Sequence, residues 1–265
     1  MRFGLTLPIF DLMADPRVLA DLAFRAEEAG WDGVFLWDHV YYRAPTTALT
    51  DPWIALAAIA ARTQRVTIGP MVTPLARRRP HVVARQVVAL DHLSGGRVVL
   101  GVGLGLDSSG GEYSRFGEET QDRRRADRFD EALELLTGLL SGEPVDHHGR
   151  YFTASDVRFL PRPVNGAIPI WVAARWPNRR PLRRAARHDG LFVIDIGPSE
   201  LALALEFVEA LRPPDRGPFE VVVQAAASSD PRPWRDAGAT WCLAAFDSFT
   251  VTPSAVQRVI DQGPP

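Results

Sequence analysis

The chain contains no lysine. All 30 of its basic residues are arginine. The absence excludes every mechanism that needs a lysine, such as a Schiff base, a lysine-bound PLP or a Gly-Lys-Ser/Thr phosphate-binding loop. The 32 acidic residues leave a formal net charge of only −2. Such a balance argues against a dedicated nucleic-acid-binding protein.

Cysteine is nearly absent as well. The single thiol, Cys242, lies in the apolar run Trp241–Ala245, where a buried and unreactive side chain is expected. One cysteine excludes a disulfide framework and a cysteine-based zinc site, and no spacing of histidines or carboxylates indicates another metal. The chain also has no apolar run of about 18 residues and no signal-peptide pattern at Met1–Leu5. We therefore expect a soluble, cytoplasmic protein with no metal and no membrane partner.

What the sequence does contain is a regular alternation of apolar, strand-like runs and helix-like segments. Its 265 residues suit one large domain or two small ones. The predicted strands cover residues 3–7, 34–37, 66–68, 97–102, 168–173, 191–196, 219–225 and 240–245. The predicted helices cover residues 16–29, 52–61, 80–93, 121–140, 179–187, 200–211 and 254–260.

This alternation predicts the fold class. Eight strands that alternate with helices indicate a parallel (β/α)8 barrel of the TIM type, as a single domain over residues 1–265. Residues 143–163 break the rhythm, and we expect an extended excursion there. An open, doubly wound sheet is the alternative.

In such a barrel the active site lies at the carboxyl ends of the strands. The second strand ends in Trp37-Asp38-His39. An imidazole titrates near neutral pH, so His39 is a candidate catalytic group, with a local structural role as the alternative. Asp38 points to the opposite side if the strand continues, so the two side chains need not pair. His92 and His188 lie near predicted helix ends, where the helix dipole favours a partly positive imidazole, and we expect structural roles for both.

Two other strand exits carry possible binding residues. The run Gly101–Leu106 lacks the third glycine of a dinucleotide fingerprint, because Leu106 occupies its position. Its glycines still allow a ligand or a neighbouring strand to approach closely. The segment Ala173–Pro181 brings arginines to the start of a helix, which indicates either a phosphate site or a solvated basic turn. Trp37 and Trp176 could offer flat walls to a planar ring or belong to the core.

Residues 80–103 closely resemble the signature of the bacterial luciferase-like monooxygenase family, which comprises flavin- and deazaflavin-dependent oxidoreductases. The most specific parts are Leu93-Ser94-Gly95-Gly96-Arg97 and Leu100-Gly101-Val102-Gly103. The resemblance covers nearly the whole chain and becomes weaker after residue 200. Further supporting segments are residues 31–39, 141–145, 159–163, 169–172 and 184–190.

The resemblance implies a (β/α)8 barrel that holds a phosphate-bearing flavin at the carboxyl ends of its strands. His39 matches a histidine that contacts the flavin ring or the substrate in many members. The run Gly69–Thr73 matches a bulge under the ring, and the Met71–Val72 peptide bond matches one that is cis in several members. The fifth strand exit matches the phosphate-contacting turn. Many relatives have Gly-Gly there, whereas this chain has Ala173-Ala174-Arg175, which makes Arg175 the candidate for a charged contact.

From the resemblance we expect an enzyme that uses FMN or coenzyme F-420 (F420) on a small organic substrate. Reduced FMN and oxygen would give monooxygenation, whereas F420 would give hydride transfer. His39 would donate or accept a proton as the catalytic residue. The expected cofactor-binding residues are Asp38, Met71, Val72, Gly103, Ala174, Arg175, Trp176 and Asn178.

The resemblance also suggests partners and alternatives. By analogy with the family we expect a homodimer, and a separate flavin reductase if the cofactor is FMN. The chain is shorter than many members, and without a long insertion near the seventh strand its pocket is expected to be more open. One alternative is a flavin-binding relative without turnover. Another is a flavin-independent barrel lyase or isomerase for a phosphorylated substrate, in which a second carboxylate, Asp38 or Glu112, would matter.

Overall fold

A computed structural model describes residues 1–265 and contains one large parallel sheet. Its strands follow the order β3-β2-β1-β11-β10-β9-β8-β5-β4. β3 (Thr67–Pro70) and β4 (Thr73–Pro74) are two halves of one interrupted strand. A bridge between Ile68 of β3 and Val98, just before β5, joins the two ends of the sheet. The sheet is therefore a closed barrel of eight strands; this confirms the predicted fold class, and the open sheet is wrong.

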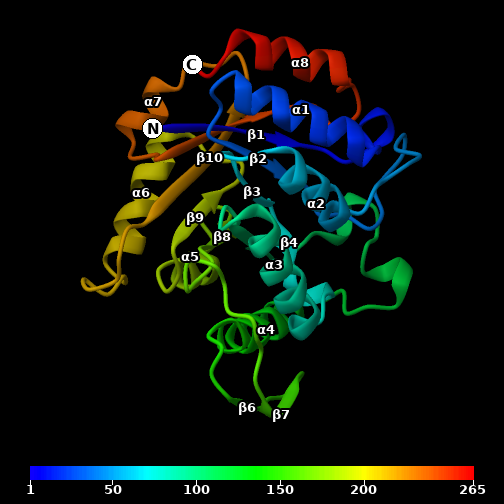
Figure 1. Ribbon diagram of the computed structural model, residues 1–265. Coiled ribbons are helices and arrows are strands. Elements are labelled where there is room, and N and C mark those ends of the chain that lie inside the picture. The colour runs from blue at the N-terminus through cyan, green and yellow to red at the C-terminus, as the bar shows by residue number, and fades with distance from the viewer.

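Helices surround this barrel, and most strands are followed by one (Figure 1). The remaining barrel strands are β1 (Arg2–Leu7), β2 (Gly33–Leu36), β5 (Leu100–Gly103), β8 (Ile170–Ala174), β9 (Gly190–Val193), β10 (Glu220–Ala226) and β11 (Trp241–Ala245). The helices are α1 (Pro16–Glu28), α2 (Pro52–Arg62), α3 (Pro80–Ser94), α4 (Asp122–Leu140), α5 (Arg179–Ala185), α6 (Pro198–Glu209), α7 (Arg232–Asp236) and α8 (Pro253–Gln262). None of the helices is both long and apolar enough to cross a membrane.

Two helices begin at the Asp-Pro pairs that the sequence marks. Asp15 accepts a hydrogen bond from the backbone N–H of Arg17 at the start of α1. Asp51 accepts two from the first turn of α2. In both helices proline occupies the first position. A backbone N–H there would have no acceptor within the helix, so its absence in proline costs no hydrogen bond. The helix starts predicted there are confirmed.

The core has two layers. Eight apolar side chains, among them the large Phe35, Trp171 and Trp241, fill the inside of the barrel. A larger cluster of 58 buried residues lies mainly between the strands and the helices. The strands approach each other closely at Gly69, where an added Cβ would lie 1.9 Å from the carbonyl oxygen of Val99. Only glycine fits this contact between two backbones.

The signature residue Arg97 joins elements at the amino-terminal end of the barrel. Its guanidinium donates hydrogen bonds to the carbonyl oxygens of Ser94 (2.7 Å), Val66 (2.8 Å), Thr63 (2.9 Å) and Ala60 (3.1 Å). These oxygens belong to the ends of α2 and α3 and to the turn before β3. Because catalytic residues of such barrels lie at the other end, Arg97 has a structural role.

The excursion after α4 forms a hairpin. β6 (Val145–His148) and β7 (Thr153–Val157) pair antiparallel and project beyond α4 (Figure 1). Glu131 of α4 holds the hairpin turn, because its carboxylate accepts hydrogen bonds from the backbone N–H groups of residues 150–152. The sequence predicts an excursion here but not the strand pairing.

The two histidines near helix ends differ from expectation in one respect. His92 Nε2 lies 2.8 Å from the carbonyl oxygen of Arg162, which is a structural contact. Burial, followed by the charge of Arg216, lowers the pKa of His188 to about 4. The helix dipole therefore does not make His188 positive at neutral pH, and that expectation is wrong.

Candidate functional site

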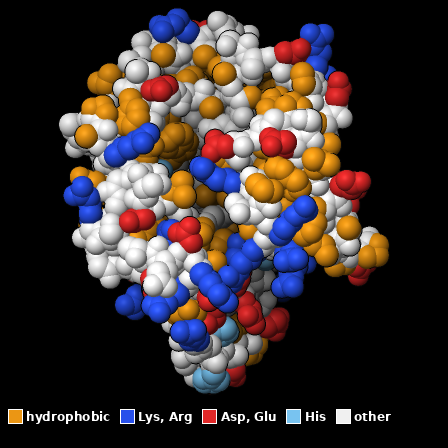
Figure 2. Space-filling view, turned by 180° about the vertical axis from the view of Figure 1, so that it is seen from behind, with side chains coloured by type: hydrophobic (Ala, Val, Ile, Leu, Met, Phe, Trp, Pro, Cys, Tyr) orange, Lys and Arg blue, Asp and Glu red, His pale blue; other side chains and the backbone are white.

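A cavity of about 700 Å³ lies at the carboxyl ends of the strands. Residues after β2, β5, β8, β9, β10 and β11 line it, together with the Met71-Val72 interruption between β3 and β4. On the face drawn in Figure 2, hydrophobic side chains are visible in a central hollow, and basic and acidic side chains surround it. The volume falls in the range of cofactor and small-molecule sites.

The predicted catalytic residue His39 contacts a buried carboxylate. Nδ1 of His39 lies 2.8 Å from Oε2 of Glu112, whose side chain is 1% exposed. The other oxygen of Glu112 accepts a hydrogen bond from the backbone N–H of Val40 (2.7 Å). A carboxylate at Nδ1 places a proton on that nitrogen and orients the ring. Nε2 is then the ring atom that can exchange a proton with a ligand in the cavity.

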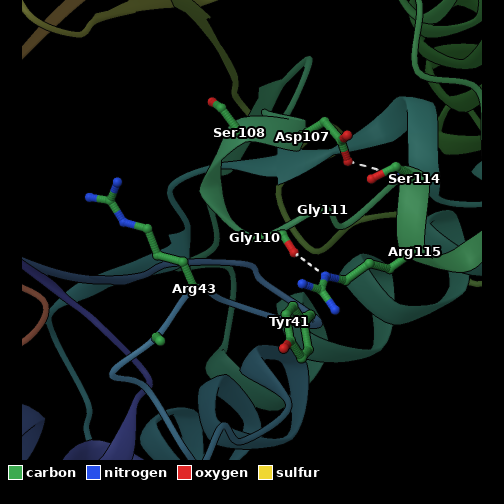
Figure 3. A pocket seen from close by; sticks show the side chains of 9 residues that line it. Tyr41, Arg43, Asp107, Ser108, Gly110, Gly111, Ser114 and Arg115 are labelled. Carbon is green, nitrogen blue, oxygen red and sulfur yellow. Dashed lines mark hydrogen bonds between the residues drawn. The ribbon is translucent and has the colours of Figure 1, made fainter.

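Glu112 belongs to the loop between β5 and α4, which is held in shape by its own polar groups (Figure 3). Asp107 accepts hydrogen bonds from the backbone N–H groups of Tyr113 (2.8 Å) and Ser114 (3.0 Å), and these bonds lower the pKa of its carboxyl group. Arg115 Nε donates to the carbonyl oxygen of Gly110 (2.9 Å). The same loop borders a second, smaller cavity of about 380 Å³. The loop thus presents Glu112 to His39 in a defined position.

Asp38 lines the cavity, as the sequence predicts, but its oxygens are occupied by groups of the chain. Oδ2 accepts a hydrogen bond from the hydroxyl of Thr73 (2.8 Å). Oδ1 lies 2.7 Å from a guanidinium nitrogen of Arg78 and 3.2 Å from one of Arg77. Arg77 also lies 3.8 Å from Glu112 Oε1. Asp38 therefore positions two partly buried arginines beside the His39–Glu112 pair, and its contact with a cofactor stays a prediction.

Met71, Val72 and Gly103 form an apolar wall of the cavity. The Met71–Val72 peptide bond is cis, as the resemblance implies, and both side chains line the cavity. An added Cβ at Gly103 would lie 2.5 Å from Cγ2 of Val72. Glycine at this position leaves room for Val72 to lie against β5 without moving into the cavity.

The exit of β8 places Ala174, Arg175 and Asn178 at the cavity. Arg175 is 47% exposed and lies 2.9 Å from the carboxylate of Asp195, which follows β9. Trp176 is outside the cavity: it packs against the core between sheet and helices, and the guanidinium of Arg179 covers its ring at 4.7 Å. Trp176 thus packs as the core alternative expects, and its contact with a cofactor stays a prediction. The helix that follows, α5, has only seven residues.

Two arginines of α5, Arg180 and Arg184, line the cavity. Arg180 belongs to the segment that the sequence marks as a possible phosphate site, whereas Arg184 has no counterpart in the sequence predictions. Both form ion pairs with Asp130 of α4. From the sequence, Glu112 is a candidate only as the second carboxylate of a flavin-independent reaction. No local pattern marks it, because it contacts a histidine 73 positions earlier in the chain.

The family model described as luciferase-like monooxygenase matches residues 1–247. The chain belongs to this family. The predicted resemblance is thereby confirmed. Among curated proteins, this luciferase-like chain is similar to the F420-dependent glucose-6-phosphate dehydrogenase of Nakamurella multipartita, with 37% identity over 166 residues, 61% of this chain and 48% of that protein. The chain spans about half the length of the curated relatives it matches.

Solved structures share the fold with this luciferase-like chain. The F420-dependent tetrahydromethanopterin reductase of Methanopyrus kandleri has a TM-score of 0.78 and 18% identity, and the match covers 99% of this chain and 98% of that one. A type II Baeyer–Villiger monooxygenase of Pseudomonas putida in complex with FMN has a TM-score of 0.68 and 22% identity, covering 85% and 67%. At such identities the likeness shows the fold alone.

Proposed function

We propose that this chain is an oxidoreductase that uses the deazaflavin F420 and transfers a hydride between that cofactor and a small hydroxy or carbonyl compound. One observation carries the proposal: the His39–Glu112 pair leaves Nε2 as the proton-exchanging atom beside an apolar wall. The F420-dependent relative at 37% identity supports this choice of cofactor.

The residues at the cavity fit both parts of such a cofactor. A planar ring needs flat apolar contacts, and Met71, Val72 and Ala173 offer them next to the side-chain-free Gly103. A phosphate needs a charged donor, and the exposed Arg175 keeps guanidinium N–H groups beyond its contact with Asp195. The whole cavity of about 700 Å³ also leaves space for a substrate.

When bound, the cofactor accepts or returns a hydride. The residues of the protein contribute the proton transfer. In the oxidation of an alcohol, Nε2 of His39 would accept the hydroxyl proton while the bound cofactor takes up the hydride, and in the reduction of a carbonyl compound Nε2 would return the proton. Glu112 stabilises the resulting imidazolium, as a carboxylate at Nδ1 does in other proton-transferring histidines. Arg77, held by Asp38, balances the charge of Glu112.

Titration of the purified protein with F420 and separately with FMN, followed by fluorescence, tests the cofactor. We expect saturable binding of F420, and absence of binding for both would contradict the proposal.

The second test is His39→Ala, which should lower kcat on the order of a hundredfold or more and change the F420 dissociation constant by less than about twofold. His148→Ala, on the exposed hairpin, is the matched control. Equal losses of kcat and affinity would remove His39 from the proton-transfer role.

Binding of FMN instead of F420 would favour monooxygenation, which is the reaction that the family description suggests. In that case we propose that a separate reductase supplies the reduced flavin, and oxygen consumption in the presence of reduced FMN would be the measurement. The homodimer stays a prediction, and analytical ultracentrifugation would test it.

A further inference from the structure

We propose that the substrate of this cavity is a neutral hydroxy or carbonyl compound with an apolar body, and that the cavity excludes sugar phosphates and other anions once the cofactor is bound. The inference rests on the proposed function, because it takes Nε2 of His39 as the atom next to the reacting oxygen.

All the arginines that line the cavity lie on one side of it. Arg175 follows β8, and Arg180 and Arg184 belong to α5, the next element of the chain. Each already has an acidic partner: Arg175 pairs with Asp195, and the other two pair with Asp130. This side is also the one to which the proposed function assigns the cofactor phosphate.

His39 lies nearly opposite these arginines. In the closed strand order β2, which precedes His39, is separated from β8 by β3/β4 and β5 in one direction and by β1, β11, β10 and β9 in the other. The lining residues beside His39 and along β11 are largely apolar or aromatic: Trp37, Tyr42 and Phe246. The ring of Tyr42 meets that of His39 edge-on, with centroids 4.9 Å apart.

The polar atoms on the His39 side are neutral or already paired. Trp37 Nε1 donates to the hydroxyl of Thr6 (3.0 Å), so Trp37 presents only apolar surface to a ligand. Arg77 and Arg78 are bound by buried carboxylates, their side chains are 7% and 16% exposed, and neither lines the cavity.

An anion on this side would therefore meet a buried carboxylate, Glu112, and no free cation. Transfer of an unpaired charge out of water is costly, and a nearby like charge adds to the cost. The loops that carry His39 and Glu112 do contain Arg43 and Arg115, but these line the smaller cavity of Figure 3 and not this one. A neutral hydroxyl needs only one acceptor, which the unprotonated Nε2 of His39 supplies, and a carbonyl needs only one donor, which the protonated Nε2 supplies.

The test measures binding to the protein saturated with F420, by saturation-transfer NMR or equilibrium dialysis. Cyclohexanol and cyclohexanone serve as neutral probes and glucose 6-phosphate as the anionic one. We expect the neutral probes to bind together with the cofactor, and glucose 6-phosphate to bind only to cofactor-free protein, if at all, and to be displaced by F420. Simultaneous binding of F420 and glucose 6-phosphate, or failure of both neutral probes to bind, would overturn the inference.

A pair of variants tests whether the neutral probe binds in this cavity. Leu106→Ser removes an apolar lining side chain and should weaken cyclohexanol binding about tenfold, because part of the apolar contact area is lost. The F420 dissociation constant should stay within about twofold. Leu93→Ser is the matched control, since Leu93 is an exposed leucine on α3 outside the cavity. Equal effects of the two variants would overturn the location of the site.

The outcomes for the proposed function and for this inference can be told apart. Absence of cofactor binding overturns the proposed function, whereas co-binding of the anion with F420 overturns this inference alone.

Discussion

At the scale of single residues, the contact between His39 Nδ1 and Glu112 Oε2 determines which nitrogen can exchange a proton. Glu112→Gln keeps the volume and an acceptor for the N–H of Val40 but removes the negative charge. We expect kcat to fall on the order of tenfold to a hundredfold, because the imidazolium loses its stabilising charge. The F420 dissociation constant should change by less than about twofold. Steady-state kinetics and fluorescence titration measure both, with Glu143→Gln on the exposed surface as control. An unchanged kcat would rule out a role for the carboxylate.

A second prediction concerns the ion pair of Arg175 with Asp195 at the cavity. The carboxylate competes with a phosphate for the same guanidinium, and exposed ion pairs of this kind are worth about 0.2–1 kcal/mol. Asp195→Asn should therefore tighten F420 binding by up to about fivefold, whereas Arg175→Ala should weaken it. Asparagine tolerates the positive φ of 53° found at this position. Asp230→Asn, in the exposed pair with Arg232, is the control. Weaker binding by Asp195→Asn would contradict the competition.

The lowered pKa of His188 predicts a pH dependence of stability. Between the ordinary value of 6.5 and about 4, the imidazole binds a proton in the unfolded chain but not in the folded protein. The free energy of unfolding therefore falls as the pH drops through this range, by up to about 3 kcal/mol from this group. His188→Gln should lose less stability than the wild type between pH 7 and pH 4.5, measured by urea unfolding. His148→Gln should behave like the wild type.

At the scale of elements, local chemistry explains which helices and strands could be predicted. The starts of α1 and α2 follow from Asp15-Pro16 and Asp51-Pro52, because a side-chain cap and a proline act within one turn. α7 was not predicted, since five residues that include a proline carry no periodicity. The pairing of β6 with β7 depends on Glu131, which reaches the hairpin turn from α4. Such contacts lie outside any local window.

The close contacts at Gly69 and Gly103 predict different effects of substitution. An added side chain at Gly69 should lower stability, whereas one at Gly103 should weaken cofactor binding. Gly69→Ala would place Cβ against a backbone oxygen, 1.9 Å from that of Val99, which cannot move without distorting the barrel. We expect a loss of about 3 kcal/mol in the free energy of unfolding. Gly103→Ala instead meets Cγ2 of Val72 at 2.5 Å, and the valine can turn into the cavity.

This second variant should therefore stay folded and bind F420 more weakly, by about tenfold or more. Urea unfolding and fluorescence titration distinguish the two effects. Normal F420 affinity in folded Gly103→Ala would show that the apolar wall does not contact the cofactor.

At the scale of the whole molecule, the first strand pairs with the last. Residues Arg2–Thr6 of β1 lie in register with Trp241–Ala245 of β11, and β11 also pairs with β10. A chain cut after residue 239 loses the strand between these two neighbours and leaves both with unpaired edges. We expect no cooperative unfolding transition for residues 1–239, measured by circular dichroism. Residues 1–262, which retain α8, should unfold cooperatively, and cooperative unfolding of the shorter chain would contradict the prediction.

The candidate site was only partly predictable. His39 and Arg175 could be found because each lies just after the carboxyl end of a strand, and these ends meet at one mouth in a parallel barrel. The role of Asp38 could not be predicted, because its partners Arg77 and Arg78 follow a different strand. Trp176 looks like a ring-stacking residue in the sequence, yet the turn after β8 directs it to the core between sheet and helices.

Local patterns were sufficient for the barrel strands, the longer helices and the position of His39, because periodicity, capping and strand ends are properties of neighbouring residues. The family followed from the resemblance of residues 80–103 to its signature. The pairing of His39 with Glu112 was decided by closure of the barrel, which brings β2 within one strand of β5. The ion pair of Arg175 with Asp195 depends on the pairing of β8 with β9, and the separation of cations from the apolar side depends on the strand order. Closure brings the ends of strands that are far apart in the chain around one cavity. Contacts across that cavity have no trace in the spacing of the residues that make them.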